Sequence, residues 1–240
     1  MNLIALIPAR SASKRILDKN IKLLNGKPLI AYTIAVAQQA GIFERIIVST
    51  DSKRIAILAE GYGIEVFMRP KEFATDLSPE FEWINHLLNE LPEKYDCFAD
   101  LRPTSPFRSV SMLKEAWWVF QERQPCDSLR AIESVDQHAF KMWYLGEDGR
   151  IRPLSERILW GEQRDPFNYP TQNLPSIYIQ NASLEIAHTQ TLKEYGNVSG
   201  ETIMPYFTSG YEGFDINTPE DWMLAELLIE KGLAILPEVK

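Results

Sequence analysis

The strongest constraint on the fold is an alternation of apolar runs with helical patterns over the first two-thirds of the chain. Strands are predicted at residues 3–7, 45–49, 64–67, 97–101 and 128–133, and helices at residues 29–40, 51–60, 79–91 and 110–121. The first run, Leu3–Ile7, is apolar throughout, as is typical of a strand covered on both faces. We therefore predict an α/β fold with a Rossmann-like, mostly parallel sheet and helices on both faces.

The alternation stops between residues 138 and 175, where Pro, Gly, Trp, Tyr and charged residues follow no regular period. A long irregular insert in a compact domain is usually functional. Regular apolar spacing returns at residues 176–187, and the segment Thr218–Asp221 predicts the start of a helix that runs to about Lys231. We predict a single domain over residues 1–240, with 138–175 as a dimerisation or lid insert.

Composition narrows the class of function. The 33 acidic and 25 basic residues give a net charge of −8, which argues against binding of nucleic acid. No window approaches the ~18 consecutive apolar residues of a membrane span, and the first residues lack the basic start of a signal peptide. Cys97 and Cys126 could form one disulfide, but no disulfide framework or zinc motif is present. We expect a soluble, cytoplasmic protein with reduced thiols.

Four cations gather in the loop that directly follows the first predicted strand: Arg10, Lys14, Arg15 and Lys19. Small residues lie between them, namely Ala9, Ser11, Ala12 and Ser13. Small residues let backbone N–H groups approach an anion, and the cations neutralise a polyphosphate. Four charges alone are also common in a solvated basic loop. The position at the carboxyl edge of the sheet favours a phosphate ligand, although the loop is not a Walker motif.

This loop and several later blocks resemble the acylneuraminate (CMP-sialic acid) cytidylyltransferases. The matching segments occur in the order of that family and span essentially the whole chain: residues 7–20 (IPARSASKRILDKN), 25–30 (NGKPLI), 49–51 (STD), 69–70 (RP), 74–78 (ATDLS), 101–108 (LRPTSPFR) and 214–221 (FDINTPED). The resemblance implies the nucleotide-diphospho-sugar transferase type of fold. It also implies transfer of CMP from CTP to a nonulosonic acid, with release of pyrophosphate, as in nucleotide-sugar biosynthesis for cell-surface polysaccharide.

The resemblance also implies roles for individual residues. Arg10, Lys19 and Asp215 would be catalytic, because charge builds up on the leaving pyrophosphate. The nucleotide would be bound by Ala9, Arg10, Ser13, Lys14, Lys19, Asn20, Arg69 and Ser78. Arg69 and Ser78 would contact cytosine, although Ser78 could equally be a helix N-cap.

The resemblance places Mg²⁺ at Asp215 and Asn217. Magnesium prefers a few carboxylates together with phosphate oxygens and water. The family usually has a second aspartate where this chain has Asn217, and an uncharged amide binds the ion more weakly. The alternative is that Asn217 caps a turn, and a lone aspartate such as Asp215 is more often a turn or cap residue outside this family.

The acceptor half departs further from the family pattern. The resemblance implies acceptor contacts by Arg102, Thr104, Ser105, Lys141, Tyr178, Asn181 and Glu185, with Arg164 as a further contact. Arg102 replaces the glutamine of the family and Glu185 replaces a tyrosine. An arginine offers a two-pronged donor for carboxylate or phosphate, and the alternative is an ion pair with Asp100 or a nearby acid. The acceptor is therefore an acidic sugar that need not be ordinary sialic acid.

The insert carries many large apolar side chains: Phe140, Met142, Trp143, Tyr144, Ile158, Leu159 and Trp160. Burial in a homodimer accounts for them, and packing over their own core is the alternative. Two other functions stay open beside the proposed one. The first is transfer to a phosphorylated or phosphonate acceptor, or from another nucleoside triphosphate. The second is a catalytically silent nucleotide-binding protein.

Overall fold

The computed structural model describes residues 1–11, 13–75, 78–157 and 165–240. The chain forms two compact units, one of residues 1–131 and 181–240 and one of residues 132–180. The second unit contains the predicted insert and extends beyond it at both ends. The predicted contacts at Ala12, Ile158, Leu159, Trp160 and Arg164 lie outside the described residues.

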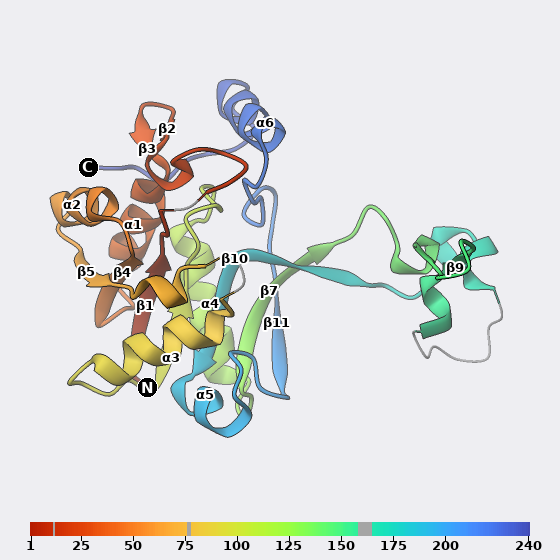
Figure 1. The fold of residues 1–240 in the computed structure, drawn as a ribbon, viewed down its shortest axis with the longest axis horizontal. Helices are drawn as coiled ribbons and strands as arrows, with labels where there is room; N and C mark the ends of the chain where they lie inside the picture. The colour runs from red at the N-terminus through yellow and green to blue at the C-terminus, as the bar shows by residue number, and fades with distance from the viewer. Residues whose placement is uncertain (12, 76–77, 158–164) are drawn as a thin grey trace. The chain divides into compact units, whose positions relative to one another are not determined.

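Within the described residues, the central sheet has the strand order β11-β7-β10-β6-β1-β4-β5 (Figure 1). Its strands are β1 (Leu3–Pro8), β4 (Arg45–Thr50), β5 (Glu65–Met68), β6 (Cys97–Asp100), β7 (Ser128–Ser134), β10 (Tyr178–His188) and β11 (Ile203–Phe207). Two short hairpins consist of β2 (Leu23–Leu24) with β3 (Lys27–Pro28), and β8 (Trp143–Leu145) with β9 (Ile151–Pro153). The α-helices are α1 (Leu29–Ala40), α2 (Lys53–Gly61), α3 (Glu80–Glu90), α4 (Val110–Glu122), α5 (Thr189–Tyr195) and α6 (Pro219–Glu230).

The predicted α/β fold with a mostly parallel sheet is confirmed. β1 pairs in parallel with β4 and with β6, and β4 pairs in parallel with β5, whereas β10 is antiparallel to β6. From β1 the chain passes to β4 and β5 on one side and then crosses to β6 on the other side of β1. The loops after β1 and β6 therefore diverge at the carboxyl edge of the sheet, which is where open α/β proteins bind ligands.

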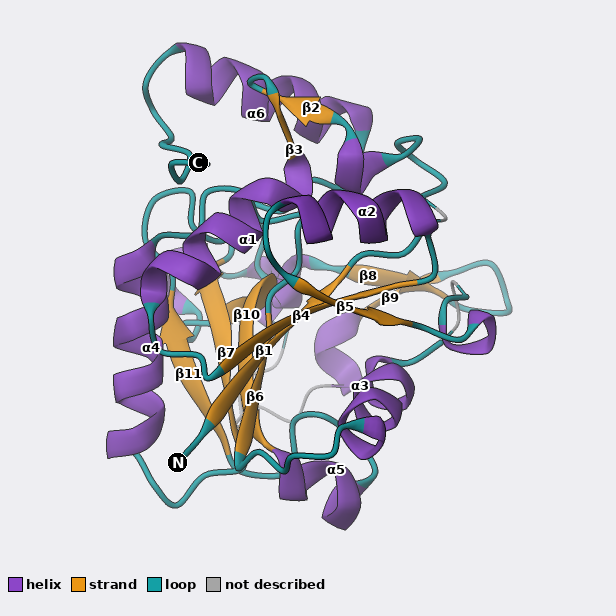
Figure 2. Cartoon of the chain, turned by 90° about the vertical axis from the view of Figure 1, so that its left-hand side faces the viewer, coloured by secondary structure: helices purple, strands orange, loops and turns teal. Residues whose placement is uncertain are grey.

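Side-chain alternation along β1 explains why helices cover both faces. Leu3, Ala5 and Ile7 are buried in one apolar cluster with residues of α1, α2 and α4. Ile4 and Leu6 point to the opposite face, where they are buried with residues of α3 and α5. Figure 2 shows the strands between α4 on one side and α3 on the other.

A third apolar cluster lies at the carboxyl edge, where α6 packs near the loop after β1. Trp222 of α6 is buried together with Ile16, Leu24 and Tyr32. The predicted start of α6 is confirmed, since Thr218 and Asp221 form a capping box with Pro219 in the first turn. Figures 1 and 2 both show α6 beside the β2–β3 hairpin at this end of the sheet.

The sequence did not predict α5 or β11. The pattern of these two elements is weak because α5 has seven residues and β11 exposes three of its five side chains. None of the helices in the described part of the chain is long and apolar enough to cross a membrane.

The second unit is built from the β8–β9 hairpin and short 3-10 helices. Leu145 faces Ile151 across the hairpin. Phe140, which precedes the hairpin in the sequence, is buried. The His138 ring contacts the Pro175 carbonyl at 2.9 Å and accepts a hydrogen bond from the Phe140 N–H. The irregular sequence is therefore held by side-chain bonds to backbone groups.

The guanidinium of Arg108 is fully buried in the first unit. It donates hydrogen bonds to the Ser183 carbonyl of β10, to Thr33 Oγ1 of α1 at 3.2 Å and to the Arg102 carbonyl at 3.0 Å. Burial lowers the pKa of Arg108 to about 10. A buried charge with neutral oxygens as its partners joins three elements at the carboxyl edge.

We predict that Arg108→Met lowers the free energy of unfolding by roughly 3 kcal/mol, because three buried oxygens lose their donors. Urea unfolding followed by circular dichroism measures the change. Arg123→Met, at an exposed residue at the end of α4, is the matched control and should change stability by less than about 0.5 kcal/mol. Equal stabilities of the two variants would contradict the role of Arg108.

Candidate functional site

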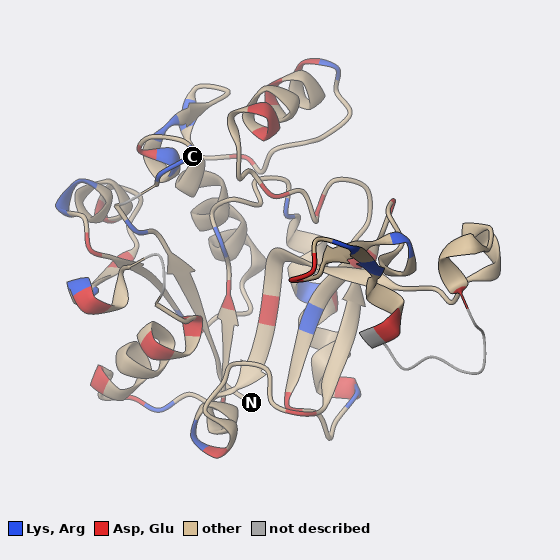
Figure 3. Cartoon of the chain, turned by 45° about the vertical axis from the view of Figure 1, so that its right-hand side comes forward, with Lys and Arg blue, Asp and Glu red and all other residues tan. Residues whose placement is uncertain are grey.

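A cavity of about 610 Å³ opens at the carboxyl edge of the sheet. The loops after β1, β5 and β6 and the segment before α6 all contribute to it. Its charged lining residues are mainly cations, and the full lining is Pro8, Arg10, Ser13, Lys14, Arg15, Ile16, Lys19, Asn20, Arg69, Phe73, Thr75, Ser78, Glu80, Trp83, Arg102, Pro103, Thr104, Asp215 and Asn217. The chain has a net charge of −8, and Figure 3 shows acidic and basic residues interspersed along the chain. The cations of the cavity are therefore a local concentration of positive charge.

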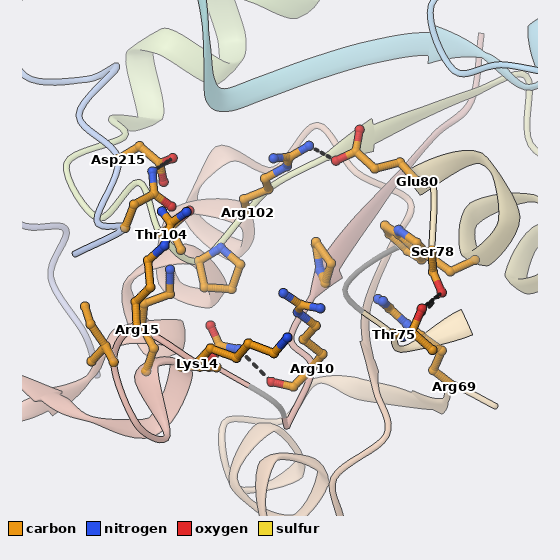
Figure 4. Close-up of a pocket in the computed structure, with 18 of the residues that line it drawn as sticks. Arg10, Lys14, Arg15, Arg69, Thr75, Ser78, Glu80, Arg102, Thr104 and Asp215 are labelled. Atoms are coloured by element: carbon orange, nitrogen blue, oxygen red, sulfur yellow. Dashed lines mark hydrogen bonds and ion pairs between the residues drawn. The ribbon is translucent and has the colours of Figure 1, made fainter. Parts of the chain in front are cut away.

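The loop after β1 is fixed by bonds to its neighbours. Asn20 Nδ2 donates to the Arg10 carbonyl at 3.1 Å. Asp51 accepts from the Ser11 N–H at 2.7 Å and from the Ser11 hydroxyl at 2.6 Å. Ala9 is buried, and its N–H donates to the Ser49 carbonyl at 2.9 Å. Asn20 and Ala9 therefore shape the loop that presents Arg10 and Lys14 to the cavity (Figure 4).

Lys19 links this loop to the segment before α6. Its ammonium donates to the Ile216 carbonyl at 2.7 Å. Burial lowers the pKa of Lys19, and the nearby carboxylate of Asp215 opposes that shift. The amine therefore faces the cavity with a fixed position and a reduced shell of water.

Arg69 is buried at the side of the cavity. Its guanidinium lies 4.3 Å from the centre of the Trp83 ring, and it donates to Ser49 Oγ at 3.0 Å and to the Ser49 carbonyl at 3.3 Å. Burial lowers the pKa of Arg69 to about 10. Aromatic stacking and two hydrogen bonds hold the guanidinium in one orientation.

Ser78 lines the same side of the cavity (Figure 4). Its hydroxyl donates to the Glu72 carbonyl at 2.9 Å and lies 2.7 Å from the Thr75 hydroxyl. The N-cap residue of α3 is Pro79. The alternative that Ser78 caps this helix is therefore wrong, and its side chain instead bonds to Glu72 and contacts Thr75.

Asp215 and Asn217 lie on the opposite side of the cavity. The Ile216 N–H donates to the Thr104 carbonyl at 2.8 Å, which joins their segment to the loop after β6. Asn217 Nδ2 donates to Asp215 Oδ2 at 2.6 Å. Asp215 Oδ1 is buried and has no hydrogen-bond partner within the described residues. That part of the chain contains no group of three or more His, Cys, Asp and Glu side chains suited to a metal ion.

Arg102 crosses the wall of the cavity between Asp215 and Glu80 (Figure 4). It forms ion pairs with Glu80 and with Asp100, the latter at 3.4 Å from Nε to Oδ2. Burial lowers the pKa of Arg102. The two alternatives from the sequence are thus compatible, since Arg102 forms the ion pair and still faces the cavity.

Three residues predicted to bind the acceptor do not line the cavity. Ser105 is buried, and its hydroxyl has no partner among the described residues. Glu185 is buried and forms an ion pair with Arg130, and Asn181 donates to Thr208 Oγ1 at 3.0 Å. Their contact with an acceptor stays a prediction.

Two more of the predicted acceptor contacts belong to the second unit. The Lys141 ammonium donates to the Phe167 carbonyl at 2.7 Å and to the Tyr169 carbonyl. Tyr178 is exposed at the start of β10. Their role in acceptor binding also stays a prediction.

The sequence analysis missed Trp83 and Glu80, which both line the cavity from the first turns of α3. The signal was available, because α3 directly follows the 74–78 block that resembles a nucleobase segment. Trp83 is buried in the apolar cluster that α3 shares with Ile4 and Leu6 of β1. Glu80 lies in the first turn of α3, where an acid is explained by its favourable interaction with the helix dipole. That explanation gave no reason to expect Glu80 beside Arg102.

The sequence also matches a known protein family and several characterised relatives. Residues 4–142 match the family model described as cytidylyltransferase. The chain is 35% identical over 237 residues to CMP-N,N'-diacetyllegionaminic acid synthase of Legionella pneumophila, covering 96% of this chain and 97% of that protein. It is 32% identical over 229 residues to N-acylneuraminate cytidylyltransferase of Escherichia coli, covering 95% of this chain and 52% of that protein. The chain thus spans about half the length of the second relative.

A solved structure shows the same fold. It is CMP:2-keto-3-deoxy-manno-octonic acid synthetase complexed with CTP, with a TM-score of 0.69, 13% identity, and coverage of 97% of this chain and 100% of that chain.

Asp100 lies at the end of β6, directly behind Arg102. Its carboxylate is buried, and Oδ1 has no hydrogen-bond partner in the described part of the chain. Burial raises the pKa of Asp100 to about 7, and so does the carboxylate of Glu185, which lies opposite Asp100 on the neighbouring strand β10. The charges of Arg108, Arg69 and Arg130 oppose this shift. The folded protein therefore retains a proton on Asp100 at pH values where the unfolded chain has lost it.

We predict that stability falls as pH rises from about 4 to about 7, with a slope of up to about 1.4 kcal/mol per pH unit from this one group. The Asp100→Asn variant should have a flatter profile over that range, because it has no proton to lose. Urea unfolding at several pH values measures both slopes. Asp136→Asn, at an exposed aspartate, is the control and should keep the wild-type slope. A slope equal to wild type in Asp100→Asn would contradict the assignment.

Proposed function

Because the chain belongs to the acylneuraminate cytidylyltransferase family, we propose that it transfers CMP from CTP to a nonulosonic acid and releases pyrophosphate. The observation that carries this proposal is the cation-lined cavity at the carboxyl edge of β1 and β6. Its volume suits a nucleotide with part of a second substrate. In the proposed reaction, a hydroxyl oxygen of the acceptor forms a bond to the α-phosphorus, and the bond from that phosphorus to pyrophosphate breaks.

The loop after β1 would hold the triphosphate. Three of its cations line the cavity, namely Arg10, Lys14 and Lys19. The hydrogen bond from the Asn20 side chain to the Arg10 carbonyl holds the backbone of the loop in place. As pyrophosphate leaves, negative charge grows on its oxygens, and cations already in place stabilise that charge without further reorganisation. The partial burial of Lys19 strengthens its effect, since electrostatic interactions increase as water is removed.

Arg69 and Ser78 would lie beside the cytosine. Trp83 and Ser49 hold the Arg69 guanidinium rigidly, so its N–H groups that are not bonded to Ser49 keep a constant direction. The cytosine carbonyl and ring nitrogen are acceptors, which suits a guanidinium donor.

We propose that Asp215, with Asn217, would hold Mg²⁺ when the triphosphate is bound. The buried, unpartnered Oδ1 of Asp215 fits a hard cation, and Asn217 fixes the other carboxylate oxygen. One carboxylate and an amide are a small protein contribution, as is usual for Mg²⁺ held mainly by phosphates and water. The ion would neutralise charge on the triphosphate when bound.

We also propose that the protein acts in the cytoplasm as a homodimer. Cys97 and Cys126 are buried and unpaired, as expected in a reducing compartment. Several large apolar side chains of the second unit are exposed in the single chain, among them Met142, Trp143, Leu145 and Ile151. Phe140 is buried within the unit, so packing over their own core accounts for one member of the predicted set. Burial against a second copy would cover the exposed ones.

We predict that Arg10→Ala lowers the rate of pyrophosphate release from CTP by about 10²–10³-fold, because the leaving group loses one stabilising cation. The assay uses Mg²⁺, CTP and a panel of sialic, legionaminic and pseudaminic acids, with ATP, GTP and UTP in parallel. Lys94→Ala is the control, since Lys94 is an exposed cation that does not line the cavity.

A fully active Arg10→Ala variant would contradict the role of the loop. CTP binding without turnover for every acceptor in the panel would instead indicate a silent nucleotide-binding protein. Turnover that needs a phosphorylated or phosphonate acceptor would overturn the nonulosonic acid as substrate.

We predict that Ile151→Glu shifts the protein from dimer to monomer in analytical ultracentrifugation, because a charge replaces an apolar side chain at the proposed contact. The control is Ile57→Glu on α2, where the isoleucine is 69% exposed against 63% for Ile151. That variant should remain dimeric. A wild-type protein that sediments as a monomer at all concentrations would contradict the proposed assembly.

A further inference from the structure

The two sides of the cavity differ in charge (Figure 4). One side is the loop after β1, which contributes Arg10, Lys14 and Arg15. The other side contains two carboxylates, Asp215 and Glu80, with the guanidinium of Arg102 between them. The highly charged triphosphate suits the first side, where Asp215 would meet it only through the proposed Mg²⁺, whereas the carboxylate of Glu80 would repel it. The part of the wall around Arg102 and Glu80 is then left for the acceptor.

Arg102 contacts two carboxylates of different kinds. Asp100 belongs to β6, and its side chain is only 4% exposed, so it cannot leave the guanidinium without a rearrangement of the sheet. Glu80 belongs to the first turn of α3, and its side chain is 30% exposed against 40% for Arg102. A change of rotamer is enough to separate Glu80 from Arg102.

The strength of the Glu80 pair decides whether a ligand can replace it. Ion pairs reached by solvent contribute little to stability, because each partner is nearly as well solvated apart. A carboxylate of a bound substrate has already lost part of its water inside the cavity and gains more from the same guanidinium. Its two oxygens also match the planar fork of arginine.

We propose that Glu80 is an exchangeable counter-ion of Arg102, and that the acceptor binds by placing its carboxylate on Arg102 where Glu80 lies in the free protein. The proposal rests on the proposed function, because it takes the acceptor to be a sugar acid. Asp100 keeps the guanidinium in position during the exchange. Glu80 and Arg102 are then residues that determine specificity for the acceptor.

Steady-state kinetics on Glu80→Gln, Arg102→Gln and the double variant test the exchange. Glu80→Gln removes the competitor and should lower the KM for the acceptor by about two- to fivefold, the range expected from loss of one exposed ion pair. Arg102→Gln should raise that KM by roughly tenfold or more, the effect of losing a charged hydrogen bond. In the Arg102→Gln background, Glu80→Gln should have no effect. The KM for CTP should stay unchanged in all three variants.

Two control variants separate the exchange from a general effect of charge. Glu82→Gln removes the same charge from the same helix at a residue that does not line the cavity. Arg45→Gln removes an arginine whose partners, Glu65 and Glu93, are remote from the cavity. Both should keep the wild-type KM for the acceptor. Arg102→Lys is the second variant if Arg102→Gln does not fold, and CTP binding by calorimetry reports folding of each.

The outcomes distinguish the inference from the function on which it rests. Turnover by the wild type with an unchanged acceptor KM in Arg102→Gln and Arg102→Lys overturns the inference alone. A rise of the acceptor KM in Glu80→Gln also overturns it, because Glu80 would then be a ligand in the resting position. Absence of turnover by the wild type with every sugar acid overturns the proposed function, and the inference with it.

Discussion

The site depends on the buried side chain of Arg108, which fixes the loop after β6. A guanidinium that is taken out of water needs partners for its N–H groups, and here these partners are oxygens of α1, β10 and the residue Arg102. The loop that begins at Arg102 is thus bonded to the sheet at one end. The Ile216–Thr104 backbone bond then transmits this position to Asp215. The position of the cavity wall that contains Arg102 and Asp215 therefore depends on the buried guanidinium of Arg108.

The same edge of the sheet concentrates ionisable groups that an ordinary core excludes. Asp100, Arg69, Arg108 and Glu185 are all buried there. Burial shifts the pKa of Asp100 upwards and that of Arg69 and Arg108 downwards, since each charged form loses water. Such groups are costly to fold and are expected where a protein keeps electrostatic interactions ready for a ligand.

The sequence predicted the strands β1, β4, β5, β6 and β7, the helices α1 to α4 and α6, and the cationic loop after β1, because each rests on a local signal. The continuous apolar run of Leu3–Ile7 and the small residues around Arg10 are recognisable without knowing what they contact. The ion pair of Arg102 with Glu80 could not be predicted, since those residues lie 22 positions apart and no helical or strand period joins them. Trp83 was missed for a related reason, because an aromatic residue on an apolar helix face reads as core. Trp83 is part of the core, and its ring also contacts the guanidinium of Arg69.

The cavity contains two kinds of cation, those fixed by bonds to the backbone and one, Arg102, that is paired with a side chain exposed to solvent. Arg69 and Lys19 are each fixed by at least one bond to the backbone, so the nucleotide side has little freedom. Arg102 is fixed on one side by Asp100 and held on the other by Glu80, a side chain that solvent reaches. Rigid groups suit a ligand whose charges are the same in every turnover, namely a triphosphate. An exchangeable pair suits the partner that differs among relatives, since a change at one exposed residue such as Glu80 can alter acceptor recognition without disturbing the buried charges behind it.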